Sequence, residues 1–144
     1  MLKSKLLGFW KLVSWEVRRS DGHITYPFGP QPDGLLVYGE NDLMTVQLGD
    51  PRRPFFASND RGLGTPEELK AAFEGYTAYF GRYALDEERS AVIHYPQLAL
   101  YPNYTGSTQV RFIQLEGKRL SLSTNPIPFQ GHEQVYVLVW EKID

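Results

Sequence analysis

Residues 82–124 read RYALDEERSAVIHYPQLALYPNYTGSTQVRFIQLEGKRLSLST, and the fold class follows mainly from this segment. Short runs rich in Val, Ile, Leu and Tyr alternate with groups of turn-forming residues, a pattern typical of strands joined directly to their neighbours. The runs predict four consecutive strands, at Arg82–Asp86, Ala91–Leu100, Thr108–Glu116 and Leu120–Thr124. Because the connections are short, neighbouring strands are expected to pair antiparallel.

The same pattern continues on both sides of this segment. Further strands are predicted at Trp10–Arg18, His23–Tyr26, Leu35–Tyr38, Leu43–Leu48 and Gln134–Lys142. The last of these is apolar on both faces and needs cover on each side. We therefore expect one domain, residues 1–144, with an all-β, mainly antiparallel, up-and-down barrel of about 8–10 strands.

One helix interrupts the strands, and its start is well marked. Thr65 suits the N-cap, Pro66 suits the first helical position, and Glu68 completes a capping box. Apolar residues follow at helical spacing and predict a helix near residues 66–80. A long loop, residues 49–64, precedes the helix, and the helix itself is a candidate cover for the last strand.

Composition excludes several classes of function. A net charge of -2 and a pI of about 5.9 give no electrostatic footprint for nucleic acid. The chain has no cysteine and three scattered histidines, so neither a metal nor another cofactor is expected. Its apolar runs are too short for a membrane span, and Lys11 interrupts the N-terminal run before any export signal is complete. We expect a cytoplasmic protein, a monomer or homodimer.

Motifs spread along the chain resemble one protein family. Gly8-Phe9-Trp10 resembles the Gly-x-Trp start of lipocalins. The other motifs are, in chain order, Trp10–Ser14, Tyr26–Gly29, Met44–Gln47, Thr65–Glu68, Gly81–Tyr83, Tyr101–Gly106, Gln109–Arg111 and Leu120–Thr124. Together they are similar to the lipocalin-like domain family of bacteria and fungi, a calycin-type β-barrel, although the Thr-Asp-Tyr motif of true lipocalins is absent. The resemblance implies a barrel with Trp10 closing one end, and implies no particular ligand or activity.

Three polar side chains are expected to face the inside of this barrel. The predicted strands Ala91–Leu100 and Thr108–Glu116 are joined by a turn centred near residues 103 and 104. If they pair about that turn, Pro96 lies opposite Arg111 and Leu98 lies opposite Gln109. His94 then shares a face with both polar residues. Arg111 could bind a carboxylate, enolate or carbonyl oxygen, Gln109 could add a donor, and His94 could act as a general acid or base.

A structural role for the same residues is equally open. The resemblance implies that a basic residue stacks on Trp10, and Arg111 and Lys142 are the two candidates for that position. His94 and Gln109 would then only satisfy backbone groups.

Other candidates complete the predicted site. Glu16 shares a face with Trp10 if the first strand alternates regularly, so it either points inward, as an acid–base partner of His94, or lies at the rim in solvent. Tyr79 and Tyr83 are expected on the pocket wall or in the core. Phe55 and Phe56 lie in the long loop and are expected to form a lid over the barrel mouth.

Three functions remain open from the sequence. The first is binding of a small hydrophobic or aromatic molecule in the barrel cavity. The second is a cofactor-independent isomerase, cyclase or dehydratase acting on a small secondary metabolite, with His94, Glu16 and Arg111 as catalytic candidates. The third is an interaction module whose cavity is filled by its own rings.

Overall fold

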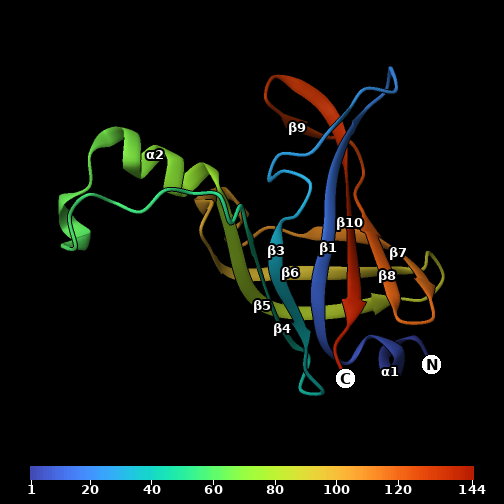
Figure 1. Cartoon of the computed structure of the whole chain (residues 1–144). Coiled ribbons are helices and arrows are strands. Elements are labelled where there is room, and N and C mark those ends of the chain that lie inside the picture. Colours follow the sequence, from blue (N-terminus) through green and yellow to red (C-terminus); the bar gives the residue numbers. More distant parts are fainter.

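Ten strands form one antiparallel sheet that closes on itself in the computed structural model, which describes residues 1–144 (Figure 1). The strands are β1 (Gly8–Arg19), β2 (Ile24–Thr25), β3 (Asp33–Tyr38), β4 (Leu43–Gly49), β5 (Tyr76–Asp86), β6 (Ala91–Ala99), β7 (Gln109–Glu116), β8 (Arg119–Ser123), β9 (Ile127–Phe129) and β10 (His132–Lys142). Eight of them form the barrel wall, while the short strands β2 and β9 pair only with β1 and β10. The predicted all-β antiparallel barrel is confirmed.

The barrel closes through its first and last strands. β1 pairs antiparallel with β10, from Trp10 opposite Lys142 to Arg19 opposite Gln134. This pairing leaves no open edge in the barrel wall, so the backbone groups of strands rich in Val, Leu and Tyr are satisfied within the chain.

The helix α2 (Pro66–Glu74) begins as predicted and ends earlier than residue 80. Its capping box is complete, because Thr65 and Glu68 each accept a hydrogen bond from the other's backbone N–H. Gly75 is the C-cap, and Tyr76 starts β5 opposite Gly49 of β4. The aromatic and β-branched residues after Gly75 fit the pleated sheet better than a helix, which ends the helix there.

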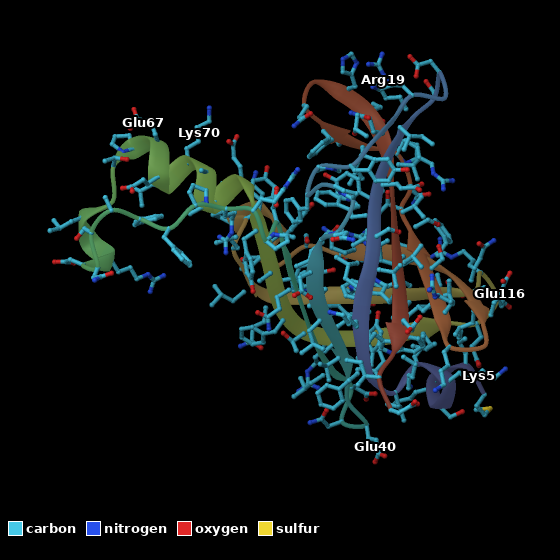
Figure 2. The ribbon with its side chains drawn as sticks, viewed as in Figure 1. Lys5, Arg19, Glu40, Glu67, Lys70 and Glu116 are labelled. Carbon is cyan, nitrogen blue, oxygen red and sulfur yellow. The ribbon has the colours of Figure 1, made fainter.

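The helix α2 projects from the barrel instead of covering β10 (Figure 1). None of its residues is buried, and its contacts with the sheet are mainly with β5. Glu67 and Lys70 extend outward from it (Figure 2). The predicted cover over the last strand is therefore wrong, and the outward valines of β10, such as Val137, stay half-buried. None of the helices is long and apolar enough to span a lipid bilayer.

The helix α1 (Leu2–Leu6), which carries Lys5, lies at the end of the barrel where Figure 2 also shows Glu40. Leu6 is fully buried, and its carbonyl accepts a hydrogen bond of 2.8 Å from Trp10 Nε1. Lys142 Nζ lies 4.6 Å from the centre of a Trp10 ring and donates to the carbonyl of Leu7. Lys142, and not Arg111, is thus the basic residue stacked on Trp10, which leaves Arg111 free for another role.

Candidate functional site

A cavity of about 550 Å³ lies inside the barrel, toward the end away from α1. Aromatic and aliphatic side chains form most of its wall, among them Trp15, Val46, Leu122, Leu138 and Trp140. Among its lining residues, Phe73 and Tyr101 are exposed to solvent and mark its open side, whereas Phe28 is buried. A cavity of this size and composition fits one small, mostly apolar molecule. The interpretation that the chain's own rings fill the barrel is therefore wrong.

The aromatic side chains in the cavity pack edge to face. The ring centre of Trp15 lies 4.7 Å from that of Phe28 and 5.3 Å from that of Tyr136. Phe129 completes the group at 6.1 Å from Trp15. Such packing holds each ring in a fixed orientation and leaves flat apolar surfaces, against which another ring can stack.

His94, on β6, is held between two tyrosines. Its side chain is only 2% exposed, and its Nε2 and Nδ1 atoms lie 2.6 Å from the hydroxyl oxygens of Tyr38 and Tyr79. Because a neutral imidazole has one donor and one acceptor, one hydroxyl donates to the ring and the other accepts from it. Burial, helped by the nearby charge of Arg111, lowers the pKa of His94 from 6.5 to about 3. His94 is therefore neutral at pH 7.

The strands β6 and β7 bring His94 and Arg111 to the same side of the wall, in a register that differs from the prediction. His94 lies opposite Gln109, and Val92 lies opposite Arg111. The predicted pairs failed because the 3₁₀ turn η2 (Pro102–Tyr104) lengthens the connection, and the end of β6 pairs only with β5. The offset is an even number of residues, so the three polar side chains still share a face.

Arg111 points into the cavity and is 9% exposed. Its Nη1 donates to the carbonyl of Val110 at 3.1 Å, and its Nη2 donates to Gln109 Oε1 at 3.2 Å. The amide nitrogen of Gln109 donates in turn to Ser107 Oγ at 2.7 Å. Gln109 therefore does not line the cavity itself, and instead holds the guanidinium in place from one side.

The other predicted pocket residues occupy different places. Tyr79 lines the cavity, whereas the hydroxyl of Tyr83 donates to the carbonyl of Gly39, outside it. Phe55 is 99% exposed and Phe56 packs near Gly64 beside α2, so neither covers the mouth. The loop that carries them follows α2 away from the barrel (Figure 1).

Glu16 lies on the outer face of β1, because the strand does not alternate regularly. Its pairing with β10 shifts between Leu12 and Ser14, and after this bulge Trp15 and Val17 are the buried residues. The Glu16 carboxylate accepts hydrogen bonds from Arg18 at 2.7 Å and from Tyr26 at 3.4 Å. The structure therefore does not bring Glu16 to His94.

Several cavity residues were missed from the sequence. Tyr136, Leu138 and Trp140 line the cavity from alternate positions of β10, a period that the apolar run masked because both faces are apolar. Trp15 was missed because the bulge reverses its direction, and no local signal marks a bulge. Tyr38 lies outside the cavity lining and contacts His94, and only the folded sheet brings β3 and β6 close enough for this contact.

Comparison with known proteins agrees with this geometry. The lipocalin-like domain family matches residues 7–143. The chain is also 36% identical, over 107 residues, to the 4'-hydroxy-3'-methoxypropiophenone carrier protein ppsC of Aspergillus oryzae. That alignment covers 69% of this chain and 96% of the fungal protein. No solved structure matches the chain significantly.

Proposed function

Because the chain belongs to the lipocalin-like domain family, we propose that it binds and carries a small, flat aromatic molecule inside its barrel. The cavity of about 550 Å³, with its aromatic wall, is the observation that carries this proposal. The fungal relative is named as the carrier of an aromatic ketone, a molecule of a size that such a cavity holds.

The position of Glu16 favours carriage over catalysis. An isomerase, cyclase or dehydratase of the kind considered from the sequence needs an acid–base pair at the substrate. Glu16 lies outside the barrel, and both ring nitrogens of His94 already have tyrosine partners. The interior offers positioning groups and apolar surface, which is what a carrier needs.

Direct titration with 4'-hydroxy-3'-methoxypropiophenone tests the proposal. Isothermal titration calorimetry is expected to give a single site with a Kd of roughly 1–100 μM, the range that apolar burial gives a ligand of this size. Leu138 lines the cavity, so Leu138→Trp should fill it and weaken binding by about tenfold or more. The matched control is Val137→Trp, on the outer face of the same strand, which should change the Kd by less than about twofold.

Two results would contradict this function. One is the absence of binding up to millimolar ligand in a folded protein. The other is equal weakening by Leu138→Trp and Val137→Trp, because the ligand would then not lie in the cavity.

Glu16→Gln should leave ligand binding unchanged, within about twofold of the unmodified protein. Its carboxylate contacts Arg18 and Tyr26 on the outer face and has no contact with the cavity. The same calorimetric titration measures this. A tenfold change in Kd would show instead that Glu16 reaches the ligand.

A further inference from the structure

The cavity contains a buried positive charge without a counter-ion. Arg111 takes part in none of the ion pairs of the chain, and its hydrogen bonds go to two neutral oxygens, the carbonyl of Val110 and the amide of Gln109. The acidic residue of the cavity lining is Glu74, which is exposed and lies at the end of α2. A buried charge normally has a partner, because removing it from water is costly.

Arg111 also has N–H groups that the chain does not use. The guanidinium has five N–H groups, of which two are used within the chain. Trp15 and Trp140 line the cavity, and the Nε1 atom of each is buried without a partner. An indole N–H can only donate. Both indole nitrogens are closed off from solvent, so the N–H groups that an acceptor in the cavity can reach are those of Arg111.

The remaining polar groups do not neutralise this charge. His94 is tied between Tyr38 and Tyr79 as a neutral ring. Burial raises the pKa of Tyr79, of Tyr104 and of Tyr136, so these phenols stay uncharged at pH 7. The interior therefore carries a single positive charge, located at Arg111.

We propose that the ligand is an organic anion, with an ionised carboxylate, enolate or phenolate oxygen on a flat apolar frame, and that this oxygen binds to Arg111. This rests on the proposed function and specifies the chemical class of its ligand. A planar guanidinium with free N–H groups matches an anionic oxygen, in both charge and geometry, better than it matches a neutral carbonyl. The aromatic wall then holds the frame of the ligand.

Two probes of nearly identical shape test the charge requirement. Cinnamate carries an ionised carboxylate at pH 7, whereas cinnamamide is neutral. Calorimetric titration in about 0.15 M salt is expected to show that cinnamate binds about tenfold more tightly, or more, than cinnamamide. Arg111→Met should reduce this preference to less than about threefold, and Arg111→Lys should retain part of it.

A matched control and a folding check accompany these variants. Arg119 lies on β8 and pairs with Glu141 at the surface, so Arg119→Met should leave both affinities unchanged. Arg111→Met removes a buried charge that has no ion-pair partner, so it is expected to fold. Should it fail to fold, the Arg111→Lys variant and the two probes on the unmodified protein still decide the question.

The outcomes separate this inference from the proposed function. If cinnamamide binds as tightly as cinnamate, the anion requirement is wrong while binding of aromatic molecules stands. The same holds if the aromatic ketone binds and cinnamate does not. A preference for cinnamate that survives in Arg111→Met also overturns the assignment to Arg111. If ketone, acid and amide all fail to bind the folded protein, the proposed function itself fails.

Discussion

Trp10→Ala is expected to lower the free energy of unfolding by about 3–5 kcal/mol, the usual cost of truncating a large buried aromatic residue. Trp10 is 1% exposed and fills the end of the barrel beside α1. Its removal leaves the carbonyl of Leu6 without its donor and removes the ring on which the Lys142 ammonium group stacks. Both losses add to the cavity that the missing indole creates. Urea unfolding at pH 7 measures the change.

Phe9→Ala is the matched control for this prediction. Phe9 is the neighbouring residue on β1 and points outward, with 53% of its surface exposed. Its truncation should cost less than about 1 kcal/mol. Because Trp10 does not line the ligand cavity, Trp10→Ala should still bind the ligand where it remains folded. Equal destabilisation by the two substitutions would contradict the role given to the buried indole.

Lowering the pH from 7 to about 4 is expected to cost the fold on the order of 3 kcal/mol through His94 alone. In the folded state the pKa of His94 is about 3, below the 6.5 of an unperturbed histidine. Below pH 6.5 the unfolded chain therefore binds a proton that the folded chain does not. Stability is complete above about pH 6.5 and falls as the pH decreases toward 3. Urea unfolding at several pH values measures this decrease.

A comparison of variants isolates the contribution of His94 from that of the carboxylates. His94→Gln keeps one donor and one acceptor between Tyr38 and Tyr79 and does not titrate, so its stability should depend less on pH from 6.5 to 4. His132→Gln, at the exposed start of β10, should follow the unmodified protein. If His94→Gln and the unmodified protein lose stability in parallel, His94 is not the cause.

Much of the barrel could be predicted because its signals are local. Turn residues separate the strands, and the contacts of Thr65, Pro66 and Glu68 lie within one helical turn. The end of α2 has no such local signal, since Tyr76 and Phe80 satisfy a helical period as well as a strand period. The sheet determines where the helix ends, because Tyr76 pairs with Gly49, which lies far away in the sequence.

The site was less predictable because it depends on register and on exceptions to alternation. The prediction that His94 and Arg111 share a face holds although the predicted register is wrong. Side chains alternate between the two faces of a sheet, so a register shifted by an even number of residues leaves both on the same face. Of the two positions considered for Glu16, the inward one is wrong because of one bulge, which turns the rest of β1 over and brings Trp15 inward instead. The partners of His94 come from β3 and β5, and no local pattern connects them to it.

The pairing of β1 with β10 has a consequence for how the chain is made. During synthesis β1 leaves the ribosome first, and its partner in the closed wall is the last of the strands to emerge. Until β10 has emerged, β1 and β8 both present unpaired edges, so the barrel wall stays open until that point. A topology dominated by such distant pairing also slows folding. The newly made chain is therefore more exposed to aggregation than the finished barrel.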